Sequence, residues 1–331
     1  MNRYPPTKPP PPHPPLQSRH RRAAVAVALT VLSLGCDARP PDPVPSSSGA
    51  SPVAPSSSAA PSTAGLLVAN GGPIRITDAN GRLVDFAGPT EPVERLSAAG
   101  GTVVAVTAGG GLFQSRPGAA DTPGEWREIH AAIGPVGRIR LPAVGPSGTE
   151  LTVATGDLQA ASFELVIVDL ATATSRAIHV DRGLDGSPAW LGPRRIALDA
   201  IRPNGAAMLV IIDPASGALC VPAITATVVS ATQDGGLLAV DDPSTGDVLV
   251  GDTDGTGGGW APGQPSRIAS SDAAGVEGLA LSADGERLAV VRRIGDQAAT
   301  IVVLAAGERD WAAIGSLEVP GDRAVSIAWL R

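Results

Sequence analysis

One element recurs along most of this chain: a short apolar run, a tight turn rich in Gly, Asp or Pro, and a second apolar run. The clearest copies are LALSADGERLAVV (279–291), VVSATQDGGLLAV (228–240) and LPAVGPSGTELTVA (141–154), and weaker ones are SPAWLGPRRIAL (187–198) and LSAAGGTVVAV (96–106). Successive copies begin their second run at intervals of about 44 residues on average. Short apolar runs between turn residues, without a sustained 3.6-residue period, predict an all-β fold.

A repeat of this length is typical of the four-stranded blade of a β-propeller. The first copy, from Leu66, lacks the inner strand that should precede it, whereas SIAWL (326–330) resembles the inner-strand segment SPAWL (187–191). We therefore expect the C-terminal strand to complete the first blade and close a six-bladed β-propeller, because closure removes open sheet edges. The expected blades are 324–331 with 66–88, then 92–132, 136–181, 182–222, 225–270 and 274–320.

The segment GLALSADGERLAVV (278–291) is similar to the SPDG-x-x-LAF repeat of TolB-type and WD40-like bacterial propellers, and to the propeller of LpqB-type lipoproteins. The other copies depart from this pattern, with Pro-Ser-Gly at 146–148, Gln-Asp-Gly at 233–235 and Pro-Arg-Arg at 193–195. The resemblance covers 66–331 as a fold. It implies blade architecture and says little about a ligand.

The first 35 residues form a leader rather than part of the fold. A proline-rich start is followed by Arg19-His20-Arg21-Arg22 and by the apolar run AAVAVALTVLSLG (23–35). That run is too short to span a bilayer, which takes about 20 residues, and it has the layout of a secretory signal. The export route, general secretory or twin-arginine, stays open.

Leu32-Ser33-Leu34-Gly35-Cys36 resembles the lipobox of bacterial lipoproteins, with Ser33 at a place that usually holds an aliphatic residue. The resemblance implies lipidation of Cys36, while an ordinary export signal or an uncleaved anchor are the alternatives. Residues 36–65 are rich in Pro, Ser and Ala, and they lack the apolar side chains that would offset the entropy of ordering. We expect three parts: a leader and signal peptide (1–35), a disordered tether (36–65) and the β-propeller (66–331). The propeller should be held on the extracytoplasmic side of the cell membrane.

The charge balance argues against nucleic-acid binding. The 25 Lys and Arg residues face 32 Asp and Glu, and five of the basic residues precede Cys36, where there is no acidic residue. A surface this acidic is repelled by phosphate backbones.

No motif for catalysis is evident. The sequence lacks a Gly-x-Ser-x-Gly elbow, a His-Glu-x-x-His pair and a P-loop. His130 and His179 occupy matching places in adjacent repeats and are expected on outer strands. Asp169 and Asp213 follow third strands and are expected to bond their own turns, and the tryptophans are expected to pack between blades. The predicted inner-strand segments hold no Asp, Glu or His, so we expect neither a catalytic set nor a cofactor or metal ion.

The candidate binding surface is the rim of loops that join strand 4 to strand 1 and strand 2 to strand 3. In a propeller these loops share one face around the mouth of the central channel, and binding residues usually lie on such loops. The rim candidates are Arg182, Asp185, Asp199, Arg202, Asp241, Asp242, Arg292, Arg293, Asp322 and Arg323.

The sequence thus favours a monomeric, membrane-tethered propeller that binds another envelope protein. The alternatives are a propeller-class hydrolase or lactonase, which needs acids or histidines on inner strands, and a purely structural envelope protein.

Overall fold

The structure is a computed structural model that describes residues 64–116, 124–129, 139–156, 162–184, 186–201, 205–222, 224–253, 265–269, 275–294, 298–307 and 310–330. These residues form 25 β-strands and one 3₁₀ turn, η1 (Gly192–Arg194). In the same ranges no helix is long and apolar enough to cross a membrane. The expected leader and nearly all of the expected tether lie outside them.

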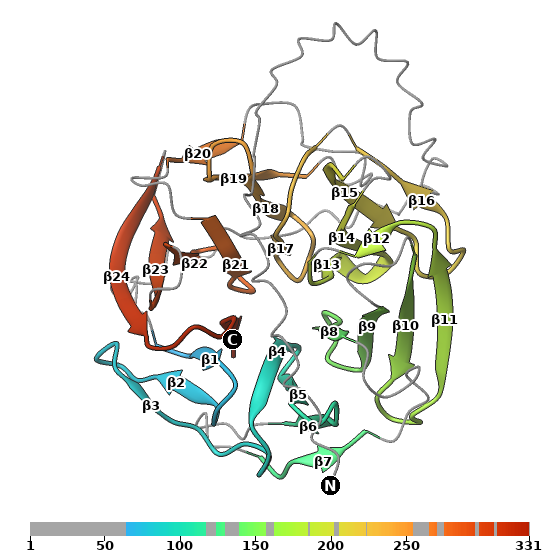
Figure 1. Cartoon of the computed structure of the whole chain (residues 1–331), viewed down its shortest axis with the longest axis horizontal. Helices are drawn as coiled ribbons and strands as arrows, with labels where there is room; N and C mark the ends of the chain where they lie inside the picture. Colours follow the sequence, from blue (N-terminus) through green and yellow to red (C-terminus); the bar gives the residue numbers. More distant parts are fainter. Residues whose placement is uncertain are drawn as a thin grey trace, which may run out of the picture. The chain divides into compact units, whose positions relative to one another are not determined.

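The strands form six antiparallel sheets around a common centre, and each sheet is one blade of a propeller (Figure 1). The strands of the first three blades, from the innermost outward, are as follows. Blade 1 contains β25 (Ser326–Trp329), β1 (Leu66–Ala69), β2 (Arg75–Thr77) and β3 (Leu83–Asp85). Blade 2 contains β4 (Val93–Ala99), β5 (Thr102–Thr107), β6 (Leu112–Ser115) and β7 (Arg127–Glu128). Blade 3 contains β8 (Ile139–Val144), β9 (Glu150–Gly156), β10 (Phe163–Asp169) and β11 (Ser175–Val180).

The other three blades follow the same order, except that blade 4 has a split inner strand. Blade 4 contains β12 (Gly183–Leu184) and β13 (Ala189–Leu191), which both pair with β14 (Arg195–Ile201), then β15 (Ala207–Ile212) and β16 (Leu219–Cys220). Blade 5 contains β17 (Val229–Ala231), β18 (Leu237–Asp242), β19 (Asp247–Asp252) and β20 (Ser266–Ile268). Blade 6 contains β21 (Gly275–Leu281), β22 (Arg287–Arg293), β23 (Ala299–Ala306) and β24 (Trp311–Val319). The predicted six blades are therefore confirmed.

The predicted closure by the C-terminal strand is also confirmed. β25 pairs with β1 in the register Leu66↔Trp329 to Ala69↔Ser326, and Leu330 N–H extends the pairing to the carbonyl of Gly65 at 2.9 Å. Figure 1 shows the red C-terminal strand beside the blue β1. The last strand in the sequence is thus the innermost strand of the first blade.

Within the described ranges the hydrophobic core forms six clusters, one in each gap between neighbouring blades. Second strands pack between two blades, so both of their faces are apolar, and β5 (TVVAVT) is buried along its whole length. The outer strand β11 is mostly exposed and carries the polar sequence SRAIHV. This difference explains why the second apolar run of each copy was the clearest part of the repeat.

Candidate functional site

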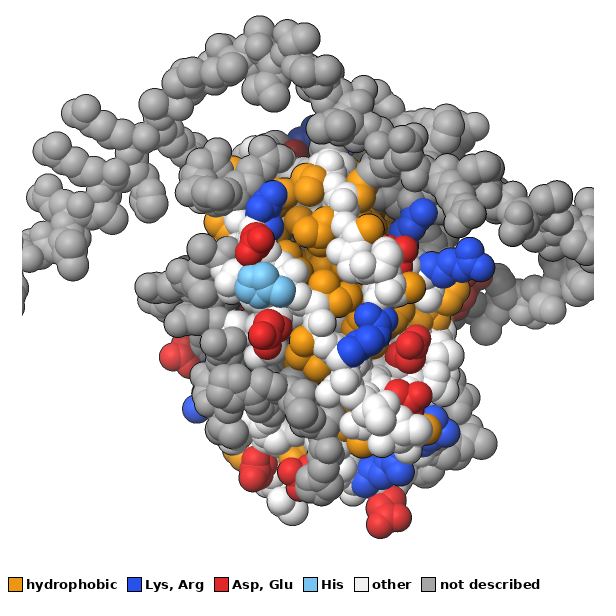
Figure 2. Space-filling model, turned by 90° about the vertical axis from the view of Figure 1, so that its right-hand side faces the viewer, with side chains coloured by type: hydrophobic (Ala, Val, Ile, Leu, Met, Phe, Trp, Pro, Cys, Tyr) orange, Lys and Arg blue, Asp and Glu red, His pale blue; other side chains and the backbone are white. Residues whose placement is uncertain are grey.

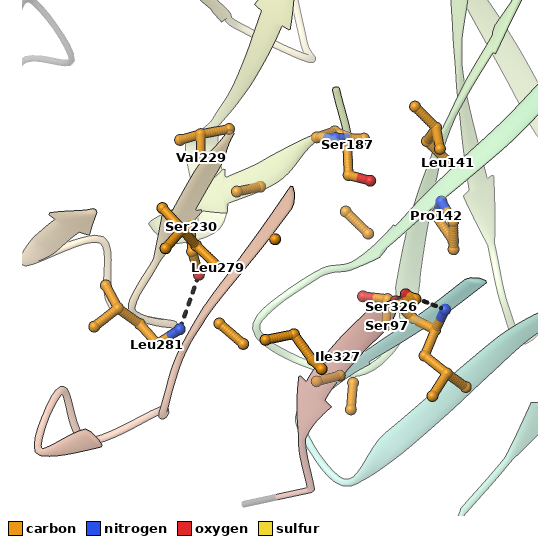
Figure 3. Close-up of a pocket in the computed structure, with 18 of the residues that line it drawn as sticks. Ser97, Leu141, Pro142, Ser187, Val229, Ser230, Leu279, Leu281, Ser326 and Ile327 are labelled. Carbon is orange, nitrogen blue, oxygen red and sulfur yellow. Dashed lines mark hydrogen bonds between the residues drawn. The ribbon is translucent and has the colours of Figure 1, made fainter. Parts of the chain in front are cut away.

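Inner strands from all six blades line a central cavity of about 270 Å³. Most of its lining is small or apolar, as in Leu96–Ala99, Leu141–Val144 and Leu279–Leu281. Polar groups lie between them, and Figure 3 shows the hydroxyl of Ser187 directed into the space between the strands. The described lining therefore combines small and apolar side chains with polar ones, which are Arg95, Ser97, Ser187, Thr227, Ser230, Gln233, Glu277 and Ser326.

Three serines of the lining join neighbouring blades. Ser326 Oγ accepts a hydrogen bond from Leu96 N at 2.9 Å, which joins blade 1 to blade 2. Ser97 Oγ accepts from Val144 N at 2.8 Å, and Ser230 Oγ accepts from Leu281 N at 2.9 Å (Figure 3). Each bond satisfies a backbone N–H that faces the channel rather than its own sheet. The wall is thus held together around the cavity as well as within each blade.

Two tryptophans make the same kind of connection. Trp190 Nε1 donates to the carbonyl of Ala143 at 3.1 Å, and Trp329 Nε1 donates to that of Ala280 at 2.8 Å. Both rings are buried in the gaps between blades. The prediction that these two tryptophans serve packing is confirmed.

Two charged side chains lie in the cavity lining: Arg95 of β4 and Glu277 of β21. The expectation that inner strands offer no titratable group is therefore wrong. The predicted segments began at Leu96 and Leu279, whereas β4 begins at Val93 and β21 at Gly275. A β-bulge falls in each of these missed stretches, between Val93 and Arg95 and between Val276 and Gly278, and a bulge breaks the alternation by which strands are recognised.

Contacts confirm that the strand 4-to-1 connections and the ends of second strands meet on one face. Arg293, at the end of β22, donates to the carbonyls of Gly321 and Arg323 at 2.6 Å each. Asp241, near the end of β18, accepts from the backbone N–H groups of Thr227 and Val228 at 2.6 and 2.7 Å. The candidates Arg293, Asp241 and Arg323 thus belong to one rim.

Two of the rim candidates are buried rather than exposed on loops. Asp199 lies in β14 at 0% exposure and Asp241 in β18 at 3%. Asp241 also accepts from Thr227 Oγ1 at 2.5 Å, so its carboxylate caps the start of the inner strand. A Cβ on Gly186 would stand 2.3 Å from Asp199 Oδ2, so a residue without a side chain is needed at 186. The expectation of solvated loop charges is wrong for both aspartates, because they lie within second strands that are covered on both faces.

The rim arginines mostly hold the rim itself together. Arg293 Nε donates to Glu277 Oε1 at 2.7 Å and its side chain is 7% exposed. Arg292 donates to Gly246 O of blade 5 at 3.2 Å, and Arg323 donates to Gly71 O at 3.3 Å. Arg182 is half-buried and donates to Asp181 O at 2.6 Å.

Asp242 and Asp322 differ in how they are held. Asp242 Oδ1 accepts from Ser244 Oγ at 2.6 Å and from Ser244 N at 2.9 Å, and the Ser244 hydroxyl contributes most to lowering the pKa of Asp242. Asp322 is exposed. Asp185, Arg202 and Cys36 lie outside the described residues, so the structure does not place them.

Other polar candidates have local partners. Asp169 Oδ1 accepts from the N–H groups of Ala171 and Thr172, and Asp213 Oδ1 from those of Ala215 and Ser216, which confirms their predicted role in turns. His179 lies on the outer strand β11, as predicted, with Nε2 at 3.0 Å from Asp181 Oδ1. His130 lies outside the described residues. Within the described ranges no three His, Cys, Asp or Glu side chains form a group that could hold a metal ion.

The outer edge of blade 4 carries a second surface feature. Leu219 and Val221 are 47% and 44% exposed, and Figure 2 shows hydrophobic side chains among charges of both signs on this side of the molecule. Cys220 lies between them and is disulfide-bonded. The sequence holds one other cysteine, Cys36.

Solved structures with the same fold include two TolB proteins. The chain aligns with TolB from Acinetobacter baumannii at 14% identity and a TM-score of 0.58, over 79% of this chain and 66% of that one, just under two thirds of its length. It aligns with a putative TolB from Agrobacterium tumefaciens at 12% identity and a TM-score of 0.54, over 80% of this chain and 97% of that one. A chain in the crystal structure of a nidogen/laminin complex aligns at 11% identity and a TM-score of 0.56, over 80% and 98%.

At these low sequence identities the structural likeness shows a shared fold. The resemblance to TolB-type and WD40-like propellers is confirmed at that level. No protein-family model and no curated protein sequence matches the chain.

Proposed function

We propose that this chain is a protein-binding module of the cell envelope: a monomeric propeller, tethered through a lipid on Cys36, that captures a partner at the channel mouth and catalyses no reaction. One observation carries the proposal. The charged ends of second strands and the strand 4-to-1 connections meet around a preformed cavity, and such loops on a rigid scaffold are where binding residues usually lie.

The fold supports a protein partner in general terms. One of the solved propellers of the same fold is part of a complex between nidogen and laminin. Rim charges of both signs favour orientation and association rate over raw affinity, as expected for contact with another protein. The proposed partner is therefore a protein and not a nucleic acid, which the acidic composition disfavours.

The chemistry of the lining supports binding over hydrolysis. General acid–base catalysis needs positioned proton donors and acceptors within reach of one substrate. Among the described lining residues Glu277 is the one acid, and Arg293 holds its carboxylate. A hydrolase substrate screen tests this part, and turnover that disappears in Glu277→Gln would contradict it.

Partner capture is tested by crosslinking in intact cells with a rim variant and a matched control. The rim variant reverses three charges and combines Arg182→Glu, Asp322→Arg and Arg323→Glu. The control makes the same three kinds of change at Arg82, Asp310 and Arg176, which are exposed in or beside the strand 3-to-4 turns on the opposite side of the blades. We expect the rim variant to lose the crosslinked partner while the control retains it. Both variants should stay folded, because exposed charges contribute little to stability and the half-buried Arg182 loses a bond to a neighbouring carbonyl only. Equal recovery by both variants would exclude the rim.

The lipid anchor rests on the apolar run before Cys36, the small residue Gly35 and the spacer behind it. One sulfur cannot hold both a lipid and a disulfide, so lipidation of Cys36 and a disulfide between Cys36 and Cys220 exclude each other. Intact-mass measurement of membrane-extracted protein should show a chain that begins at Cys36 with added acyl mass. Cys36→Ser should lose that mass and the membrane retention. A native chain without acyl mass, two mass units lighter than its reduced form, would identify a disulfide instead.

A further inference from the structure

Arg95 is placed at the channel mouth by a β-bulge. In the β4–β5 ladder Val93 pairs with Thr107 and Arg95 with Val106, which leaves Glu94 as the extra residue. Bulges re-aim the side chains beside them. Because the bulge falls between them, Val93 is buried in the core, whereas Arg95, which shares a face with Ser97, lines the cavity.

The guanidinium of Arg95 is half-buried and has few protein partners. Burial lowers the pKa of Arg95, while the carboxylates of Glu94 and Glu277 act in the opposite direction. Its hydrogen bond to a described residue runs from NH1 to the carbonyl of Glu94 at 3.2 Å. A guanidinium has five N–H donors, so donors beyond this bond lie beside the cavity, where they form no hydrogen bond with the described residues.

Glu277 does not neutralise Arg95 fully, because it already binds another arginine. Its Oε1 accepts from Arg293 Nε at 2.7 Å, and the same arginine reaches the carbonyls of Gly321 and Arg323 at 2.6 Å. Among the described lining residues Arg95 is the one basic side chain, and the one acidic side chain, Glu277, is paired with Arg293, which leaves the carboxylate of Glu94 as the other acid that acts on Arg95. This single cation lies in a chain whose overall charge is −7.

We propose that the channel mouth binds a carboxylate group of the partner, which the guanidinium of Arg95 holds through paired N–H donors. This inference rests on the proposed protein-binding function and names the group that is recognised. A planar guanidinium matches a carboxylate in a two-pronged geometry. A carboxylate brings one negative charge to this acidic protein, whereas a phosphate dianion brings two. The Ser97 hydroxyl, whose oxygen already accepts from Val144 N, retains its own hydrogen to donate beside Arg95.

Carboxylate binding is tested on the full chain with two blocked tripeptides, acetyl-Ala-Asp-Ala-amide and acetyl-Ala-Asn-Ala-amide. They differ by one charge. Binding is followed by the Nε–Hε NMR signal of Arg95 and by tryptophan fluorescence, since Trp190 and Trp329 also line the cavity. We expect saturable binding of the Asp peptide and at least about tenfold weaker binding of the Asn peptide, because hydrogen bonds to charged groups are the strong ones.

Variants assign the effect to Arg95. Arg95→Gln should weaken the binding of the Asp peptide about tenfold or more. The affinity of Arg95→Lys should lie between that of the native chain and that of Arg95→Gln, because lysine keeps the charge and loses the paired donors. Arg176→Gln removes the same charge from the exposed outer strand β11 and should bind as the native chain does. Circular dichroism should show the same fold in all three variants.

Several outcomes would overturn the inference: no binding of the Asp peptide by the folded native chain, equal binding of both peptides, or full binding by Arg95→Gln. Tighter binding of inorganic phosphate than of acetate would show that the site prefers a dianion. A different result would contradict the proposed protein-binding function: the native chain would crosslink no partner. A native chain that captures a partner, and an Arg95→Gln chain that captures it equally, would contradict the inference and leave the protein-binding function standing.

Discussion

At the scale of single residues, the buried aspartates of the rim shape the inner strands. Asp241 takes two backbone N–H groups and one hydroxyl at the point where blade 5 begins its inner strand. These donors lie next to the channel and would otherwise lack a partner in the sheet. A carboxylate that looks like a surface charge in the sequence is therefore part of the framework that positions the mouth.

We predict that Asp241→Ala destabilises the protein by about 1–3 kcal/mol, the usual cost of leaving buried donors without an acceptor. Urea unfolding followed by tryptophan fluorescence measures this change. Asp322→Ala is the matched control, because Asp322 lies on the same rim with an exposed side chain, and such a change should stay within about 0.5 kcal/mol. Equal stability of the two variants would contradict the capping role.

Asp234 makes a pH-dependent contribution in the turn between β17 and β18. Its Oδ1 accepts from Thr232 Oγ1 at 2.6 Å and from Gly236 N at 2.8 Å, and the Thr232 hydroxyl contributes most to holding its pKa below the usual range. Because the folded pKa lies below the unfolded one, the ionised carboxylate stabilises the fold above about pH 4, and this contribution is lost as the pH falls through the folded pKa. Asp234→Asn should therefore lower the unfolding midpoint at pH 7 and have a smaller effect below pH 4. Midpoints at a series of pH values check this, and a difference that is constant with pH would contradict it.

At the scale of elements, neighbouring blades fit together through the turns between their first and second strands. Gly100 and Gly101 form the β4–β5 turn, both with positive φ (54° and 72°). A Cβ on Gly100 would lie 2.3 Å from Gly148 N of the blade 3 turn, whereas a Cβ on Gly101 would meet nothing within 4 Å. The same close approach recurs between Gly192 of blade 4 and Gly235 of blade 5.

This pair of glycines separates backbone strain from packing. Gly101→Ala should cost about 1–2 kcal/mol, the penalty of a left-handed conformation for an L-residue. Gly100→Ala bears the same strain and in addition pushes the turns of blades 2 and 3 apart, so it should be clearly the less stable variant. Thermal unfolding of both variants measures the difference. Equal midpoints would show that the turns have room to separate.

The elements also show where sequence reasoning succeeds and where it fails. Second strands such as β5 and β9 are buried on both faces, so their apolar runs are continuous and their spacing reveals the blades. Inner strands have one edge on the channel, and β4 and β21 each contain a β-bulge near their first residues. Alternation breaks at those places, so Arg95 and Glu277 were missed. The burial of Asp199 and Asp241 depends on neighbouring segments that no local pattern specifies.

At the scale of the whole molecule, one strand completes the ring. β25 supplies Trp329 to the gap between blades 6 and 1, where its ring also lies 4.4 Å from the guanidinium carbon of Arg287. Deletion of residues 326–331 removes this ring and leaves the edge of β1 open. We expect a loss of at least about 3–5 kcal/mol, the cost of removing a buried tryptophan alone, together with aggregation through the exposed edge. Calorimetry and size-exclusion chromatography test this, and an unchanged midpoint in a monomeric truncated chain would contradict closure.

The order of synthesis adds a consequence of the β1–β25 pairing. The ribosome makes β1 before every other strand of the propeller and β25 after all of them, and the two must find each other across more than 250 intervening residues. Contacts this distant in sequence form slowly, because the entropy of loop closure must be overcome first. While the chain is growing, β1 can pair with β2 and pack against blade 2, but no strand pairs with its inner edge. A nascent chain that stalls before Ser326 therefore presents an unpaired apolar edge, which is the kind of surface that chaperones and proteases recognise. The ring is therefore complete only when its last strand has paired with its first, and until then one apolar edge stays open to aggregation.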